Sequence, residues 1–137
     1  MAEYAKPLPD IADPNMAPYW AAAKQHELRM QRCTSCGYVR FPPAKHCPEC
    51  LDENAEWVVL SGRGTVWSFG VYHHVFNGNF AGDIPYNVAL VELEEGPRLV
   101  TNIVGIKNEA IEVGMPVEVV FDDVTDEVTL VKFRPSG

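Results

Sequence analysis

The cysteines of this chain form two pairs of the type Cys-x-x-Cys, with ten residues between the pairs. Each turn of this type brings two sulfurs to one side, and two turns supply the four thiolates that tetrahedral Zn²⁺ prefers. The spacing therefore predicts one structural Zn²⁺ site. Its ligands would be Cys33, Cys36, Cys47 and Cys50.

Other uses of these cysteines fit the spacing less well. Either pair alone could be a redox dithiol, but two pairs so close together are typical of a metal site. A catalytic zinc needs an open position for water, and four thiolates leave none. His46 precedes Cys47, but we expect it to lie beside the site or on the surface, because the cysteines already complete the tetrahedron.

The residues around the cysteines must form two tight turns and a short strand pair. Gly37 follows the first pair and can adopt a left-handed conformation, while Pro48 restrains the second turn. Residues 28–33 alternate in polarity and predict a strand that leads into the first pair. These features predict a zinc ribbon, a module too small to fold without the free energy of metal binding.

The segment before the ribbon predicts an extended arm and then a helix. Residues 1–14 contain prolines and no regular period. In residues 15–27, an alanine run favours a helix and Pro18 fits its first turn. Tyr19 and Trp20 make the start of this helix apolar, so we expect an exposed interface there.

The rest of the chain, from residue 57 onward, predicts five β-strands. The first spans about residues 57–76, and glycines interrupt it, as in a strand that bends around a small barrel. Two hairpins follow, which turn at residues 94–97 and 123–126. Five strands in this order predict an OB-type Greek-key barrel, with an SH3-like barrel or an open sandwich as alternatives.

The predicted fold is mainly β. It consists of an N-terminal helix, a rubredoxin-like four-cysteine zinc ribbon and a five-stranded OB-type β-barrel. The expected divisions of the chain are 1–26 for the arm and helix, 27–56 for the ribbon and 57–137 for the barrel.

The first barrel strand carries aromatic residues where nucleic-acid-binding OB folds place stacking side chains. Alternation along the strand puts Trp67, Phe69 and Val71 on one face. We expect this bulkier face to be core. A single-stranded nucleic-acid-binding or scaffold module is nevertheless the alternative function.

The 137-residue chain has a net charge of −8, but residues 24–46 carry +4, with five basic residues against one acidic residue. We call these five the basic island: Lys24, Arg29, Arg32, Arg40 and Lys45. The acidic remainder opposes binding to nucleic-acid phosphates. The basic island could attract an anionic ligand or an acidic partner surface, although any one of its residues could be an ordinary solvated charge.

The sequence contains no recognised catalytic motif and no apolar run long enough to cross a bilayer. His73 and His74 are the candidates for a catalytic base, but neighbouring strand residues face opposite ways and no partner is evident. We therefore expect no catalytic residue. The N-terminus lacks the pattern of a secretory signal, so we expect a cytoplasmic protein without membrane contact.

Four segments together resemble one known family. They are "YWAAAKQHELRMQRCTSCGYVRFPPAKHCPEC", "WVVLSGRGTVWSF", "PYNVALVELEEGPRLVTNIVG" and "VGMPVEVVF". In this order they resemble the zinc-ribbon and OB-fold family known as domain of unknown function thirty-five. The most specific parts are "RFPP" at 40–43 and "SGRGTV" at 61–66.

Members of that family pair with thiolase-like and aldolase-like enzymes that act on aromatic, steroid or fatty acyl-CoA thioesters. The resemblance therefore implies a noncatalytic accessory subunit of a hetero-oligomer, which helps form the acyl-CoA site of its partner. Since CoA carries phosphates, the basic island suits it. The expected contacts with CoA or with the partner are Arg29, Arg32, Arg40, Lys45, Tyr19 and Trp20.

Overall fold

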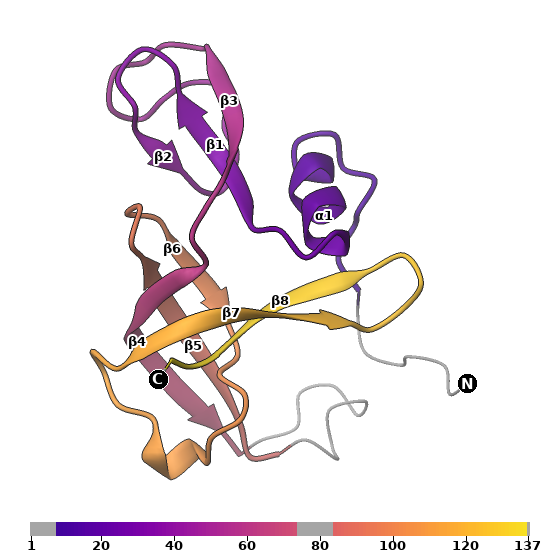
Figure 1. Ribbon diagram of the computed structural model, residues 1–137, viewed down its shortest axis with the longest axis vertical. Coiled ribbons are helices and arrows are strands. Elements are labelled where there is room, and N and C mark those ends of the chain that lie inside the picture. Colours follow the sequence, from indigo (N-terminus) through magenta and orange to yellow (C-terminus); the bar gives the residue numbers. More distant parts are fainter. Residues whose placement is uncertain (1–7, 74–83, 137) are drawn as a thin grey trace.

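The structure is a computed structural model that describes residues 8–73 and 84–136. One small sheet lies at one end of the molecule, a larger curled sheet lies at the other, and a single α-helix lies beside the junction (Figure 1). This arrangement confirms the predicted fold class, which is mainly β with one N-terminal helix. Among the residues described, no helix is both long and apolar enough to cross a membrane.

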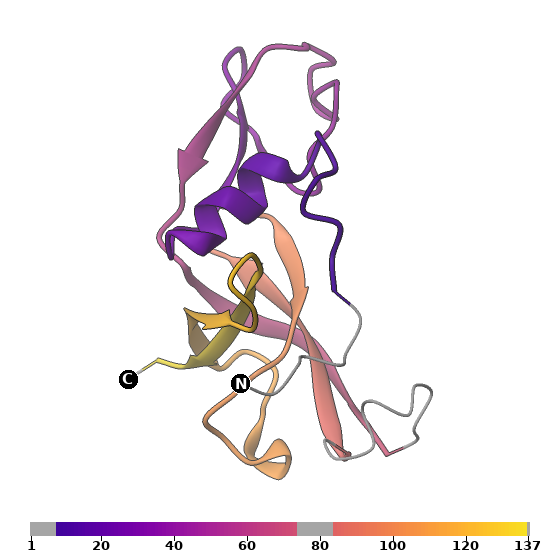
Figure 2. The same ribbon diagram turned by 90° about the vertical axis from the view of Figure 1, so that its right-hand side faces the viewer.

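The helix α1 spans Ala17–Lys24, within the segment predicted to be helical. Pro18 occupies its first turn, where a missing backbone N–H costs nothing. The buried face of α1 consists of Tyr19, Ala22 and Ala23. Figure 2 shows that α1 lies across the junction between the two sheets, and it contacts strands of both.

The small sheet has three antiparallel strands in the order β2-β1-β3. Its central strand β1 spans Arg29–Cys33, as the alternating pattern predicted, and β2 is Val39–Arg40. The third strand, β3, spans Ala55–Val59 and pairs with β1 along its whole length. This sheet carries both cysteine turns at one end and joins the barrel at the other.

The large sheet has five antiparallel strands in the order β6-β5-β4-β7-β8. Their bounds are Arg63–Tyr72 for β4, Tyr86–Leu93 for β5, Arg98–Thr101 for β6, Pro116–Asp123 for β7 and Thr129–Pro135 for β8. A short 3-10 helix, η2, spans Asn108–Ala110 before β7. The number and order of the strands match the predicted barrel.

A parallel bridge between Ile103 and Phe133 closes the barrel. Two backbone bonds form it: the Phe133 N–H donates to the Asn102 carbonyl at 3.1 Å, and the Val104 N–H donates to the Phe133 carbonyl at 2.8 Å. Phe133 is fully buried at this point. The segment that directly follows β6 therefore meets β8 around one buried aromatic side chain, which removes part of the open edge of the sheet.

The predicted first barrel strand is in fact two strands in two sheets. Its initial residues belong to β3 in the small sheet, and the barrel begins with β4. The chain turns between them at Gly62, whose φ of +78° favours glycine. The boundaries predicted for the three divisions of the chain stay a prediction.

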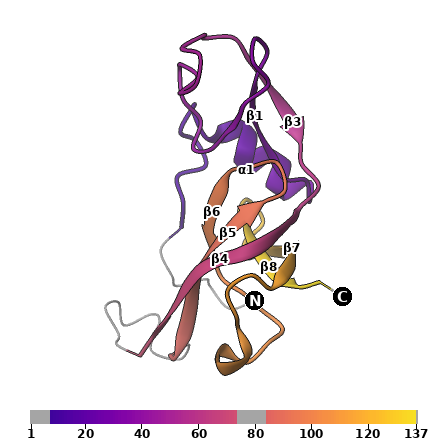
Figure 3. The same ribbon diagram turned by 90° about the vertical axis from the view of Figure 1, so that its left-hand side faces the viewer.

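The prediction that Trp67 belongs to the core is wrong. A β-bulge between Val66 and Ser68 shifts the register of β4 against β5. The bulge adds one residue to the strand, so the side-chain alternation changes phase there. As a result Val66 is fully buried and Phe69 is partly buried against the core, whereas Trp67 is 47% exposed. Figure 3 shows the long, strongly twisted path of β4.

The two sheets and α1 share one hydrophobic core. Its buried residues are Tyr19, Leu28, Met30, Leu60, Val66, Ala89, Val91, Leu93, Leu99, Ile103, Ile111, Val117 and Phe133. Because the cluster runs from the helix through the small sheet into the barrel, the orientation of the ribbon is set by packing.

Candidate metal centre and adjacent pocket

The four cysteine sulfurs lie close enough together to bind one metal ion. All four Sγ atoms are within 4.8 Å of one another. The Cys33–Cys50 and Cys36–Cys47 sulfur pairs are 3.5 and 3.6 Å apart. A zinc ion with bonds of about 2.3 Å to four sulfurs in a tetrahedron requires sulfur separations of about 3.8 Å. The donor set and its dimensions therefore fit Zn²⁺.

The first cysteine turn follows directly from β1. Cys33 is the last residue of that strand, and its N–H donates to the Tyr38 carbonyl at 2.8 Å. The Gly37 N–H closes the turn by donating to the Cys33 carbonyl at 2.9 Å. Gly37 has a φ of +81°, the left-handed conformation predicted for it.

The second cysteine turn repeats this geometry without a glycine. The Leu51 N–H donates to the Cys47 carbonyl at 2.8 Å, and Leu51 takes a φ of 67°. The Cys47 N–H donates to the Asp52 carbonyl, and the Glu49 N–H points at the Cys47 sulfur at 3.4 Å. A leucine in this conformation carries backbone strain that the turn must offset. Nothing in the residue type of Leu51 predicts this role.

Backbone amides favour the thiolate form of two of the cysteines. The Cys36 backbone amide lowers the pKa of Cys33 to about 7. Burial alone would raise the pKa of Cys47, but the amides of Cys50 and Glu49, together with hydrogen bonds to the Cys36 and Cys50 side chains, lower it. The Asp52 amide acts in the same direction on Cys50, yet the adjacent sulfurs, first that of Cys33, raise the pKa of Cys50 to about 12. Four thiolates so close together need a cation to hold them.

His46 lies apart from the sulfur cluster. Its Nε2 is 3.0 Å from Glu53 Oε1, and more than half of its side chain is exposed. The group of four potential metal ligands contains the cysteines alone. This placement is compatible with the prediction that His46 is a surface residue.

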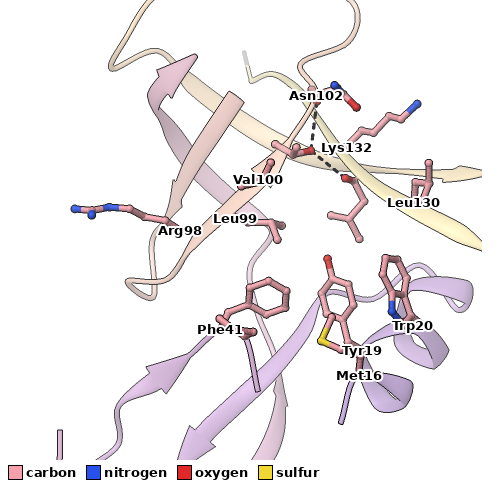
Figure 4. Close-up of a pocket in the computed structure, with 13 residues that line it drawn as sticks. Met16, Tyr19, Trp20, Phe41, Arg98, Leu99, Val100, Asn102, Leu130 and Lys132 are labelled. Atoms are coloured by element: carbon pink, nitrogen blue, oxygen red, sulfur yellow. Dashed lines mark hydrogen bonds between the residues drawn. The ribbon is translucent and has the colours of Figure 1, made fainter. Parts of the chain in front are cut away.

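A pocket of about 490 Å³ lies where α1, the ribbon and the barrel meet (Figure 4). We call it the junction pocket. It is lined by Met16, Tyr19, Trp20, Phe41, Pro42, Arg98, Leu99, Val100, Thr101, Asn102, Leu130, Val131 and Lys132. Its volume is in the range of small-ligand sites, which are mostly apolar with a few polar groups.

The junction pocket lies beside the bridge that closes the barrel, where residues of β6 and β8 face α1 and the ribbon. Next to that bridge, the Thr101 Oγ1 donates to the Val131 carbonyl at 2.9 Å in place of a backbone bond. Tyr19 packs edge-on against Trp20, with ring centroids 4.9 Å apart, and against Phe41 at 5.1 Å. Helix, ribbon and barrel thus each contribute side chains to one apolar wall.

The two aromatic residues predicted to contact CoA or a partner do line the junction pocket, but only one is accessible. Tyr19 is buried, so the expectation of an exposed Tyr19–Trp20 anchor is wrong for Tyr19. Burial also raises the pKa of Tyr19, so its hydroxyl stays protonated. The shared core explains this, since the Tyr19 ring fills the space between α1 and the ribbon.

The basic island does not form one surface. Arg29 Nη2 donates to Glu27 Oε1 at 2.9 Å. Arg32 is exposed, and alternation in β1 places it on the opposite face from Arg29. Arg40 is buried, whereas the Lys45 side chain is 79% exposed. Sequence proximity brought these residues into one segment, but strand alternation separates Arg32 from Arg29.

Two basic residues that the sequence reasoning missed lie at the junction pocket. The Arg98 guanidinium lies 4.1 Å from the ring centre of Trp67, and its Nε is 3.1 Å from Glu92 Oε2. Figure 4 shows the Arg98 side chain directed away from the pocket. Lys132 Nζ donates to Asp122 Oδ2 at 2.7 Å. Neither residue belongs to a sequence motif, so only the folded barrel could identify them as residues that line the junction pocket.

Of the two histidines considered as catalytic candidates, His73 belongs neither to the cysteine cluster nor to the lining of the junction pocket. His73 is exposed just beyond the end of β4. His74 lies outside the described residues.

Two domain families match adjacent parts of this chain. Residues 20–56 match the "ChsH2, rubredoxin-like zinc ribbon domain" and residues 57–122 match the "ChsH2, C-terminal OB-fold domain". Both agree with the cysteine cluster and the closed five-stranded barrel. The fold and the metal centre thus define a protein of the zinc-ribbon and OB-fold class.

Individual relatives name the family. A "DUF35 domain-containing scaffold protein" of Methanocaldococcus jannaschii is 40% identical over 70% of this chain and 68% of its own length. A "Probable enoyl-CoA hydratase alpha subunit" of Thermomonospora curvata is 45% identical over 96% of this chain, which spans only 40% of that relative. A chain of the solved "Ltp2-ChsH2(DUF35) aldolase" is 43% identical with a TM-score of 0.83, over 93% of this chain and 98% of that chain. The chain belongs to the DUF35 family, as the resemblance predicted.

Proposed function

We propose that this chain is a noncatalytic, zinc-containing accessory subunit of an enzyme that acts on acyl-CoA thioesters. It docks on a thiolase-like or aldolase-like subunit and helps form the acyl-CoA site. The observation that carries this proposal is the match to the Ltp2-ChsH2(DUF35) aldolase, which extends over almost the whole of both chains. The name of that complex joins a DUF35 chain to a second component in one aldolase.

The junction pocket supports this proposal because three separate elements form it. A site at the meeting point of helix, ribbon and barrel is sensitive to how these elements are held, and a docked partner would hold them. Its apolar wall, which includes Trp20, Leu99 and Val100, suits an acyl or other weakly polar part of a thioester ligand. Aromatic, steroid and fatty acyl groups are all candidates for the substrate.

Zinc has a structural role in this proposal. Cys33, Cys36, Cys47 and Cys50 would hold one Zn²⁺, and bound zinc supplies a cross-link between the two turns. Phe41 directly follows β2, so the ribbon that zinc would stabilise holds the Phe41 ring against Tyr19. The metal centre thus helps to shape one side of the junction pocket without meeting substrate.

Native mass spectrometry of the untagged protein, purified from its own host, tests this proposal. We expect a zinc-loaded chain within a larger assembly that contains a thiolase-like or aldolase-like subunit. Assays of the separated subunits should then give acyl-CoA turnover only when both are present. A zinc-loaded monomer without a companion, or full activity of the partner alone, would contradict the proposal.

A further inference from the structure

Arg40 is a buried cation whose hydrogen-bond partners are all neutral. Only 4% of the residue is exposed. Its Nε donates to Gln31 Oε1 at 2.9 Å and its Nη2 donates to the Ala44 carbonyl at 2.8 Å. Its buried Nη1 has no hydrogen-bond partner. Within residues 8–73 and 84–136, no carboxylate forms an ion pair with it.

Such an arrangement is energetically unfavourable unless a negative charge offsets it. Arginine is almost never fully buried without a charged partner, and neutral partners replace only part of the lost hydration. A buried donor without a partner adds a further desolvation penalty. Arg40 therefore points to an anion that the described residues do not supply.

Arg40 forms part of the wall of a second pocket, of about 430 Å³, on the ribbon. We call it the ribbon pocket. It is lined by Asn15, Gln31, Arg40, Pro43, Ala44, Lys45, Glu53 and Ala55. None of these residues lines the junction pocket. The two pockets are therefore distinct sites.

The ribbon pocket is rich in hydrogen-bond donors that could meet an anion. Lys45 stands at its mouth with a highly exposed ammonium group, and its Nζ is 4.0 Å from Glu53 Oε1. That carboxylate is shared with His46, whose Nε2 is closer at 3.0 Å. Lys45 is thus only weakly paired. Gln31 uses its carbonyl oxygen for Arg40 and for the Ala44 N–H, so its amide group remains as a donor.

We propose that the ribbon pocket binds an oxyanion, the phosphate or carboxylate group of a ligand or partner. Lys45 contacts the oxyanion directly at the mouth, and the charge of the oxyanion offsets that of Arg40 in the wall. A guanidinium and an ammonium group on one pocket are the combination by which proteins hold such groups. This site does not depend on the proposed acyl-CoA function, since any oxyanion of suitable size satisfies the same donors.

The test is a titration of the zinc-loaded full chain with inorganic phosphate at low, constant ionic strength. Each step of the titration is monitored by ¹H–¹⁵N NMR. A parallel titration uses sodium acetate. We expect saturable shifts of the backbone amides of Gln31, Ala44 and Lys45. Saturation by phosphate alone identifies a phosphate site, and saturation by acetate alone identifies a carboxylate site. Both results support the proposal.

Variants distinguish a specific binding site from general electrostatic attraction. Lys45→Gln changes an exposed residue, so the fold should survive, and we expect phosphate or acetate to bind about tenfold more weakly because one charged contact is lost. Arg40→Gln removes the buried charge that the oxyanion offsets, and should also weaken binding. The matched control is Arg32→Gln, which removes one positive charge from the opposite face of β1 and should leave the affinity within about twofold.

Three results would overturn the proposal. The first is the absence of saturable shifts for both anions. The second is an equal loss of affinity in Arg32→Gln and Lys45→Gln, which would mean diffuse attraction. The third is a result that makes the zinc-bound thiolates the source of the counter-charge. Arg40→Gln would then weaken zinc binding, measured by competition with a chromophoric chelator, and leave anion binding unchanged.

Discussion

His26 Nε2 lies 2.9 Å from Asp123 Oδ2, so a side-chain contact joins the end of α1 to the end of β7. The two residues are 97 positions apart in the chain. The His26 ring also stacks on Phe121, with ring centroids 5.1 Å apart and an interplanar angle of 16°. This contact holds the helix, and with it Trp20 at the junction pocket, against the barrel.

The Asp123 contact predicts a loss of stability in acid. The hydrogen bond from Thr129, and after it the contact with His26, hold the pKa of Asp123 below its usual value. A carboxyl group with a lowered folded-state pKa stabilises the fold at pH values above its unfolded pKa of about 3.9, and loses this effect as the pH falls through the folded pKa. Asp123→Asn should therefore flatten the dependence of the free energy of unfolding on pH below about 4.

Urea denaturation at a series of pH values measures this effect. Asp126→Asn is the control, because it removes the same charge from the same hairpin. Asp126 is exposed, and its side chain forms no hydrogen bond or ion pair with the residues that the structure describes. An identical pH profile for Asp123→Asn and the wild-type protein would show that the contact does not contribute.

Zinc removal should unfold the ribbon and weaken the whole molecule. Zinc binding supplies most of the folding free energy of small zinc modules, and Met30 of the ribbon is part of the shared core. We expect one zinc per chain by elemental analysis and a lower Tm after chelation. Cys47→Ser should lose most of the zinc, while Thr34→Ala on the neighbouring turn should retain it. Full thermal stability without zinc would contradict a structural role.

Gly64 should not tolerate a side chain. A Cβ at this position would lie 2.4 Å from the Glu92 carbonyl oxygen and 3.0 Å from Val91 Cγ1. The clash is with backbone of β5, which the sheet pairing holds in place. Gly64→Ala should therefore lower the free energy of unfolding by about 2 kcal/mol.

Gly70 on the same strand is the matched control for Gly64. Its added Cβ would meet only Tyr72 Cε2, at an ordinary contact distance of 3.9 Å. Gly70→Ala should change the free energy of unfolding by less than about 1 kcal/mol. Chemical denaturation of the two variants compares these values, and equal destabilisation would argue against the clash.

The junction pocket should be needed for the activity of the assembled enzyme. Val100 lines the pocket, is 68% exposed and supports no core contact, so Val100→Arg should fold normally. We expect it to lower kcat/KM of the complex at least about tenfold, by placing a charge on an apolar surface. The control is Val113→Arg, because Val113 is 67% exposed and lies outside the pocket. Equal activity of both variants would remove the pocket from the proposed function.

Nucleic acid should not bind, although Trp67 and Tyr72 are exposed on the barrel. The net charge of −8 repels phosphates, and Arg98 beside Trp67 is already paired with Glu92. We expect no change in fluorescence anisotropy of a labelled single-stranded oligonucleotide at low salt. Salt-sensitive, saturable binding would instead support the alternative of a nucleic-acid-binding module.

Features that depend on local chemistry could be predicted from the sequence. The spacing of the cysteines, the left-handed Gly37 and the helix start at Pro18 are each set by a few adjacent residues. The strand pattern likewise predicted five barrel strands, because alternation and turn residues are local signals. The resemblance of quoted segments then predicted the family that the relatives confirm.

Features that depend on which strands meet were decided by the tertiary structure. One extra residue at the Val66–Ser68 bulge turned Trp67 outward, and no glycine at positions 66–68 marks this bulge in the sequence. Strand alternation placed Arg29 and Arg32 on opposite faces of β1, although the two residues are close in the chain. The junction pocket arises only where β6 and β8 meet the aromatic side chains of α1 and the ribbon. The sequence thus determined the cysteine cluster and the elements, whereas packing between distant elements determined which side chains remain available to a ligand or a partner.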